Sequence, residues 1–270
     1  MAYEILVLDI DGTLTNSNKE ISDVTKKAIR EIQDRGHHVV LASGRPTAGI
    51  LPIAKELNLE MFGGYVLSFN GAKVINCKTK EIIFQNTIPS DLIADIYKAA
   101  EEEDVSVISY DDKSIITSSK IDEYMEKESK INHMPIKVVE DFVSYLDFPV
   151  NKCLMTGDPD YLAQVEKRMK ERFGDRLSIY RSEPFFLEIM PLNIDKAHSL
   201  EKLLDKLHMS REQMISCGDG YNDLTMIQYA GKGVAMGNAQ KEIQEAADYI
   251  TLTNDEDGVA HVIDKFMLAV

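Results

Sequence analysis

Four apolar residues near the amino terminus are followed at once by two carboxylates. The run Ile5–Leu8 has the length and composition of a strand buried on both faces, and Asp9 and Asp11 follow it. In an open parallel sheet, ligands bind at the carboxyl ends of strands, and residues two apart in a strand share a face. Both acids could therefore point at one substrate; the alternative is that they are two solvated acids in a loop.

Strand and helix patterns alternate along much of the chain. Strands are expected at residues 5–8, 38–42, 65–69, 213–217, 233–236 and 249–252, and helices at 22–35, 46–57, 196–207, 224–229, 241–247 and 257–268. Pro46 suits the first turn of its helix. This alternation predicts right-handed crossovers and an α/β fold with a doubly wound, mostly parallel, Rossmann-like sheet.

The pattern changes in the middle of the chain, where helices stand beside hairpins. Helices are expected at residues 90–103, 121–131 and 160–173, a strand at 151–156, and hairpins at 105–118 and 177–190. Such a mixture predicts an α+β unit with an antiparallel sheet. We therefore expect a core made of residues 1–82 and 191–270, interrupted by an inserted domain at 83–190.

Composition excludes several classes of partner. The net charge of −15 argues against nucleic acid and anionic membrane as partners, although a local cation or metal can still attract an anionic substrate. No apolar stretch approaches the ~18 residues of a membrane span, and the amino terminus lacks the pattern of a signal peptide. Cys77, Cys153 and Cys217 are far apart and lack metal-ligand spacing, so we expect reduced thiols in a cytoplasmic protein without a zinc site.

Polar residues also follow three further core strands that the sequence predicts, and one lysine begins the helix directly after the insert. Each set alone has an ordinary explanation, because such residues form turns and helix caps or lie solvated on a helix. Together they combine carboxylates and other oxygen ligands, which suit Mg²⁺, with a hydroxyl, a lysine and loop amides, which suit phosphoryl oxygens. The set contains Ser43, Gly44, Arg45, Asn70, Lys196, Asp219, Asn222 and Asp223.

These motifs resemble those of the haloacid dehalogenase superfamily of phosphohydrolases. The match is to Asp9-Ile-Asp-Gly-Thr13, Ala42-Ser-Gly-Arg-Pro46, Asn70-Gly-Ala72, Asn193-Ile-Asp-Lys196 and Gly218-Asp-Gly-Tyr-Asn-Asp223. Within the superfamily, the chain is similar to the Cof-type sugar-phosphatase group, which has a large type-two cap. Order and spacing fit from residue 5 to about residue 258, and Ala197 stands where that group usually has glycine.

The resemblance implies a role for each motif residue. Asp9 would be the nucleophile that forms an aspartyl-phosphate, and Asp11 the general acid and then base, which requires it to be protonated at the first step. We therefore expect the pKa of Asp11 to be raised by the adjacent carboxylate or by desolvation. Mg²⁺ would be held by Asp9, the backbone carbonyl of Asp11 and Asp219; phosphate by Ser43, Gly44, Lys196 and Asn222; Asp223 would support Lys196 or the metal shell, and Arg45 and Asn70 would line the pocket.

The inserted domain is, by the same resemblance, a cap that sets substrate specificity. Tyr180, Arg181 and the turn at residues 111–113 are candidates for that role, or ordinary solvated loop residues. The expected substrate is a small phosphorylated metabolite, a sugar phosphate in the leading interpretation, and the expected assembly is a monomer or weak homodimer. Three alternatives stay open: a phosphatase of flavin mononucleotide or pyridoxal phosphate, a sensing protein without turnover, and a mutase, which the type-two cap resembles less.

Overall fold

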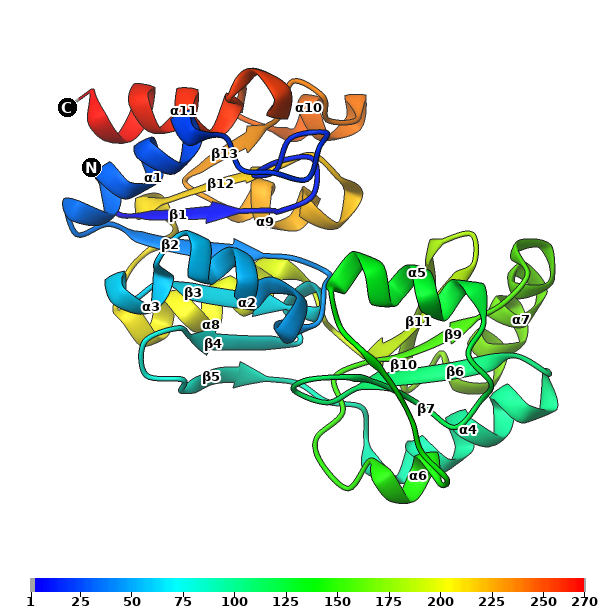
Figure 1. The fold of residues 1–270 in the computed structure, drawn as a ribbon. Coiled ribbons are helices and arrows are strands. Elements are labelled where there is room, and N and C mark those ends of the chain that lie inside the picture. The colour runs from blue at the N-terminus through cyan, green and yellow to red at the C-terminus, as the bar shows by residue number, and fades with distance from the viewer. Residues whose placement is uncertain (1–2, 270) are drawn as a thin grey trace. The chain divides into compact units, whose positions relative to one another are not determined.

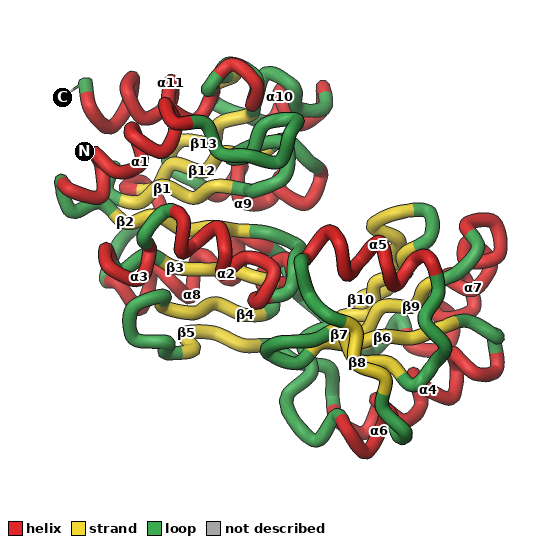
Figure 2. The backbone as a smooth tube through the Cα atoms, viewed as in Figure 1, coloured by secondary structure: helices red, strands yellow, loops and turns green. Residues whose placement is uncertain are grey.

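The chain divides into two compact units. The computed structural model describes residues 3–269. Unit 1 comprises Met1–Phe84 and Asp195–Val270, and unit 2 comprises Gln85–Ile194, so the chain crosses between them twice. Each unit contains a sheet flanked by helices (Figures 1 and 2). No helix among the described residues has both the length and the apolar composition needed to span a membrane.

Unit 1 is built on an eight-stranded sheet with the order β14-β13-β12-β1-β2-β3-β4-β5. The neighbours of β1 are β2 and β12, and both pairs are parallel. The pairs from β14 to β3 are all parallel, and β4 joins β3 in the antiparallel sense. This arrangement confirms the predicted doubly wound, mostly parallel α/β fold. The strands are β1 (Ile5–Leu8), β2 (His38–Ala42), β3 (Tyr65–Ser68), β4 (Lys73–Asn76), β5 (Ile82–Gln85), β12 (Met214–Gly218), β13 (Lys232–Ala235) and β14 (Tyr249–Ile250).

Helices cover both faces of this sheet, because alternate residues of each buried strand point to opposite sides. Leu6 and Leu8 pack in a cluster with apolar residues of α1, α2 and α11, whereas Ile5 and Val7 pack with residues of α8 and α9. The helices are α1 (Asp23–Asp34), α2 (Thr47–Glu56), α3 (Leu59–Phe62), α8 (Lys196–Leu207), α9 (Leu224–Tyr229), α10 (Lys241–Ala246) and α11 (Gly258–Ile263), which continues as a π-helical turn at Asp264–Leu268.

Unit 2 has a six-stranded sheet with the order β10-β11-β9-β6-β7-β8, in which only the β7–β8 pair is parallel among the described pairs. Its strands are β6 (Ser106–Tyr110), β7 (Ile115–Thr117), β8 (Ile136–Val138), β9 (Cys153–Thr156), β10 (Leu177–Glu183) and β11 (Phe186–Pro191). Its helices are α4 (Ile93–Glu102), α5 (Glu123–Asn132), α6 (Phe142–Tyr145) and α7 (Pro159–Phe173). Apolar residues of α4, α6 and α7 pack on one face of the sheet and form the core of this unit.

Two local expectations differ from the structure. Pro46 lies at the N-cap of α2 in an extended conformation, one residue before the first turn in which it was expected. The strand expected at 65–69 ends at Ser68, because Phe69 and Asn70 both have positive φ and turn the chain away from the sheet. This turn brings Asn70 next to the loop that follows β2, where its backbone N–H donates to the carbonyl oxygen of Ser43 at 3.0 Å.

Candidate active site

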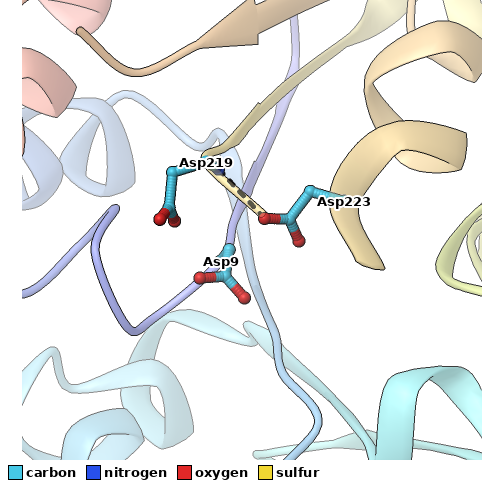
Figure 3. Close-up of side chains that lie close together, drawn as sticks. All are labelled: Asp9, Asp219 and Asp223. Carbon is cyan, nitrogen blue, oxygen red and sulfur yellow. Dashed lines mark hydrogen bonds between the residues drawn. The ribbon is translucent and has the colours of Figure 1, made fainter. Parts of the chain in front are cut away.

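Three carboxylates converge at the carboxyl edge of the unit 1 sheet (Figure 3). Asp9 follows β1, Asp219 follows the neighbouring strand β12, and Asp223 immediately precedes α9. Each acid contributes one oxygen to a group whose atoms all lie within 4.8 Å of one another. The parallel pairing of β1 with β12 therefore brings together acids that are more than two hundred residues apart in the chain.

Lys196 neutralises part of this negative charge. It is the first residue of α8, a helix capped by Asp195, and its side chain is completely buried. Its Nζ donates to Asp9 Oδ1 at 2.7 Å, to Asp223 Oδ1 at 2.5 Å and to the carbonyl oxygen of Ala42 at 2.8 Å. Burial alone would lower the pKa of Lys196, but the charges of Asp223 and Asp9 outweigh it and hold that pKa above its ordinary value. The lysine is therefore a fixed cation.

Backbone and hydroxyl donors fix the other two acids. Asp223 Oδ2 accepts hydrogen bonds from the N–H groups of Asp219 and Gly220, both at 3.0 Å. Thr13 Oγ1 donates to Asp219 Oδ1 at 2.8 Å. Gly12 has φ of +87°, and a Cβ at this position would collide with Asp219 Oδ2. Glycine thus allows the loop after Asp9 to pass directly beside Asp219.

The site holds more negative charge than one lysine can balance. Burial, together with the charge of Asp223, raises the pKa of Asp9 to about 8 despite the contact with Lys196. Burial likewise raises the pKa of Asp219 to about 6, although the hydrogen bond from Thr13 opposes the shift. A cluster of carboxylate oxygens with excess negative charge fits a hard divalent cation such as Mg²⁺, which takes oxygen ligands.

The surroundings of Asp11 contradict the expected rise of its pKa. Arg45 binds it in a bidentate manner, through Nε to Oδ2 at 2.8 Å and through Nη2 to Oδ1 at 2.7 Å, and Lys19 Nζ lies 3.0 Å from Oδ1. Burial raises the pKa of Asp11, but the hydrogen bonds and charges of Arg45 and Lys19 outweigh it and leave that pKa below its ordinary value. The Asp11 carboxylate therefore belongs to a separate ion cluster from that of Asp9.

Besides Lys196, the residues predicted to bind phosphate are Ser43, Gly44 and Asn222, and they lie with the predicted pocket residue Asn70 in loops of unit 1. Ser43 is buried, and its Oγ accepts a hydrogen bond from the Arg45 N–H at 3.2 Å. Asn222 Nδ2 donates to Asn70 Oδ1 at 3.2 Å. A Cβ at Gly44 would stand 3.1 Å from the same Asn70 oxygen. These four residues thus come from the ends of β2, β3 and β12. The roles of Ser43, Gly44 and Asn222 toward phosphate, and of Asn70 in the pocket, stay predictions.

The sequence did not predict some of the contacts in this site. Thr13 belongs to the motif at residues 9–13, but no role was predicted for it. Its short spacing from Asp9 in the sequence was the signal that could have placed it in the site. Lys19 gave no signal, because only the path of the loop carries it back to Asp11. Of the residues proposed for specificity, Arg181 Nε donates to Glu166 Oε2 of α7 at 3.0 Å, and Asp111 Oδ1 accepts backbone hydrogen bonds within its own turn.

Comparison with known proteins identifies the family of this chain. A family model described as haloacid dehalogenase-like hydrolase matches residues 6–263. The chain belongs to this family. A solved haloacid dehalogenase-like hydrolase from Bacteroides thetaiotaomicron is 48% identical, has a TM-score of 0.95, and covers 97% of this chain and 99% of its own.

Two further proteins resemble this chain along nearly its whole length. The crystal structure of TM0651 from Thermotoga maritima is 31% identical, has a TM-score of 0.90, and covers 97% of both chains. YcsE of Bacillus subtilis, named 5-amino-6-(5-phospho-D-ribitylamino)uracil phosphatase, is 31% identical over 98% of this chain and 96% of its own. The family resemblance expected from the motifs is therefore confirmed, and it includes both units.

Proposed function

We propose that this haloacid dehalogenase-like phosphatase hydrolyses small phosphorylated metabolites, sugar or polyol phosphates in particular, with Mg²⁺ and through an aspartyl-phosphate on Asp9. The observation that carries the proposal is the group of buried Asp9, Lys196 and Asp223 with half-buried Asp219 at the edge of the unit 1 sheet. Phosphatases among the relatives support the reaction class. We further propose that the protein acts in the cytoplasm, as a monomer or weak homodimer.

Lys196 prepares Asp9 for attack on phosphorus. A carboxylate that approaches an anionic phosphate is repelled by it, and a fixed ammonium group at 2.7 Å from Asp9 Oδ1 reduces that repulsion. Oδ1 is held by Lys196, so the other oxygen is the one that we assign to the attack. In-line displacement of the alcohol then forms the acyl phosphate, and water hydrolyses it in a second step.

Asp9, Asp219 and Asp223 are the side chains that would hold Mg²⁺, with the backbone carbonyl of Asp11 as a further ligand on the family resemblance. The cation, when bound, neutralises charge that develops on the phosphoryl oxygens. The hydroxyl group of Thr13 holds the Asp219 side chain in position to bind the cation, and the backbone N–H groups that bind Asp223 do the same for its carboxylate.

Asp11 is the residue that we assign to proton transfer. Its ionised form, paired with Arg45 and Lys19, suits acceptance of a proton from the attacking water in the second step. Donation to the leaving alcohol in the first step requires a protonated carboxyl group. We therefore assign to Asp11 an exchange of partners, in which the leaving oxygen replaces at least one of the two cations and the carboxylate takes up a proton from solvent, which it then gives to the leaving alcohol.

Phosphate release from a panel of phosphorylated metabolites, with Mg²⁺ and with chelator, tests the proposal. We expect release that depends on Mg²⁺ and is abolished by Asp9→Asn with retention of the fold, because the amide cannot act as the nucleophile. Asp34→Asn, which removes an exposed acid from α1, serves as the control and should leave the rate unchanged. Normal turnover by Asp9→Asn would rule out the assignment of the nucleophile, and release from no substrate would favour a sensing protein.

A further inference from the structure

One asparagine outside the group of acids contacts the loop that carries Asp9 and Asp11. Asn238 lies in the loop between β13 and α10, and its Nδ2 donates to the carbonyl oxygen of Gly12 at 2.8 Å. Strand β12 lies between β13 and β1 in the sheet, so this contact joins loops whose strands are not neighbours. Asn238 is exposed, and the proposed chemistry gives it no role. We therefore asked what its contact with Gly12 does.

A second asparagine completes the contact. Asn254, in the segment that follows β14, donates its backbone N–H to Asn238 Oδ1 at 2.9 Å. Its own Nδ2 donates to the carbonyl oxygen of Thr15 at 2.9 Å. The amide of Asn238 thus makes one contact as a donor and one as an acceptor, and a single orientation of that amide fits both. We call Asn238 and Asn254 the asparagine clamp.

Gly237 lets the two loops of the clamp come this close. Its N–H donates to the carbonyl oxygen of Leu252 at 3.0 Å, and a Cβ at Gly237 would lie 2.9 Å from the backbone nitrogen of Thr253. A larger residue would therefore push the two loops apart. In the same loop, the N–H of Gln240 donates to the carbonyl oxygen of Asp219 at 3.3 Å. The loop after β13 thus contacts both loops that carry the acids.

The clamp acts on the backbone at a point where glycine is required and is also a weakness. A Cβ at Gly12 would collide with Asp219, yet glycine has more conformational freedom than any other residue. Gly12 separates Asp11, whose carbonyl oxygen we assign to Mg²⁺, from Thr13, which donates to Asp219. Rotation at Gly12 would move these groups relative to each other. The hydrogen bond from Asn238 to the Gly12 carbonyl oxygen opposes that rotation.

Stability alone gives little reason for this contact. An exposed hydrogen bond between neutral groups competes with water and adds little to the free energy of unfolding. The same loop is also tied to the segment after β14 at another point, where Ser17 donates to Asp255 through its N–H at 2.8 Å and its Oγ at 2.7 Å. The place of the Asn238 contact, directly between Asp11 and Thr13, therefore points to organisation of the acids.

We propose that Asn238, supported by Asn254, is a positioning residue that keeps the Asp11 carbonyl oxygen and the Asp219 carboxylate at the separation that Mg²⁺ requires. The inference rests on the proposed function, which includes the cation. Mg²⁺ demands near-ideal octahedral geometry, so a small displacement of one ligand weakens its binding. Groups that orient metal ligands typically contribute about 10–100-fold to metal affinity or activity.

Calorimetric titration of the substrate-free protein with Mg²⁺ tests the inference apart from turnover. Asn238→Ala removes both hydrogen bonds of this amide and should raise the Kd for Mg²⁺ at least ~10-fold. Asn238→Leu keeps the volume of the side chain without its polar atoms and should have the same effect. Asn254→Ala removes the donor to Thr15 but keeps the N–H that binds Asn238, so its Kd should lie between those of wild type and Asn238→Ala.

Steady-state kinetics, with a substrate that the wild-type protein hydrolyses, gives a second measurement. The kcat of Asn238→Ala should fall about 10-fold, because displaced acids lose their geometry toward the reacting phosphate. KM for the phosphorylated substrate should stay within about twofold, since the clamp holds none of the residues assigned to phosphate.

Asp255→Ala is the matched control, because it removes the contacts of Ser17 in the same loop and leaves the contact with Gly12 intact. Its Kd for Mg²⁺ and its kcat should stay within about twofold of wild type, because the carbonyl oxygen of Gly12 keeps its donor. Thermal melting without Mg²⁺ checks that each variant folds.

The outcomes distinguish this inference from the proposed function. An unchanged Kd for Mg²⁺ in Asn238→Ala and Asn238→Leu, an equal loss in Asp255→Ala, or failure of both Asn238 variants to fold would overturn the inference while the phosphatase assignment stands. A wild-type protein that binds no Mg²⁺ and releases no phosphate would overturn both.

Discussion

At the scale of single residues, Gly12 connects backbone geometry with the arrangement of the acids. Its φ of +87° is unfavourable for other residues, and any Cβ would collide with Asp219 Oδ2. Gly36 has nearly the same φ, +90°, but a Cβ there would meet no atom within 4 Å. Comparison of substitutions at these two glycines therefore separates the effect of backbone strain from the effect of displacing Asp219.

Gly12→Ala should consequently lose both stability and activity, whereas Gly36→Ala should lose stability alone. Each substitution places alanine in a left-handed conformation, which lowers the free energy of unfolding by about 1–2 kcal/mol. Displacement of Asp219 should lower kcat/KM of Gly12→Ala at least ~10-fold, since small misplacements of a catalytic group are expensive. Urea unfolding and phosphate release measure the two effects, and equal activity in both variants would contradict the assignment of Asp219.

Residues that belong to a dense local motif could be predicted from the sequence. Residues that reach the site only because of how the chain folds could not. Asp9 stands directly after an apolar run and Asp219 follows the strand expected at 213–217, which predicted their place at the sheet edge. The cations around Asp11 come from the loop that follows β2 and from a turn eight residues away, and no sequence pattern specifies those contacts. The expectation of a raised Asp11 pKa was wrong because it considered the neighbouring acid and desolvation, but not the two cations that outweigh them.

At the scale of elements, long amphipathic helices and buried strands were predictable and short irregular ones were not. The expected helices at 196–207 and 224–229 and the strand at 38–42 have the bounds of α8, α9 and β2. The sequence reasoning missed α3, β8 and α6, which have three or four residues each. Elements of that length contain too few residues to show a hydrophobic period, and tertiary packing decides their conformation.

His38, the first residue of β2, makes the stability of this sheet depend on pH. Burial lowers the pKa of His38 from 6.5, although the charge of Glu4 and a backbone contact with Gly63 oppose the shift. The folded state therefore favours the neutral imidazole. Its contribution to stability is complete above pH ~6.5 and is lost as the pH falls through the lower pKa of the folded state.

His38→Gln should therefore flatten the decline of stability in weak acid. The free energy of unfolding of the wild-type protein should fall more steeply below about pH 6.5 than that of the variant, because the variant has no imidazole to charge. Urea unfolding at a series of pH values measures the two slopes. Parallel curves would mean that protonation of His38 does not oppose folding.

At the scale of the whole molecule, the two units have separate cores and separate kinds of polar group. Unit 1 packs two apolar clusters on the faces of its parallel sheet and gathers fixed charge at one edge. Unit 2 packs one apolar core against its sheet and also buries the ion pair of Lys152 with Glu188.

This division predicts a local response to Mg²⁺. Binding by Asp9, Asp219 and Asp223 should slow amide hydrogen exchange in residues 8–14 and 216–224, because the cation cancels repulsion among those carboxylates. At a concentration one hundred times the Kd, the stabilisation is about 2.7 kcal/mol, so exchange that requires opening of the site should slow by up to ~100-fold. Strands β9 and β11 of unit 2 should exchange at unchanged rates in the absence of substrate. Asp9→Asn should reduce the effect in unit 1, since it removes a charged ligand. Equal protection in both units, or none in residues 8–14, would place the cation elsewhere in the chain.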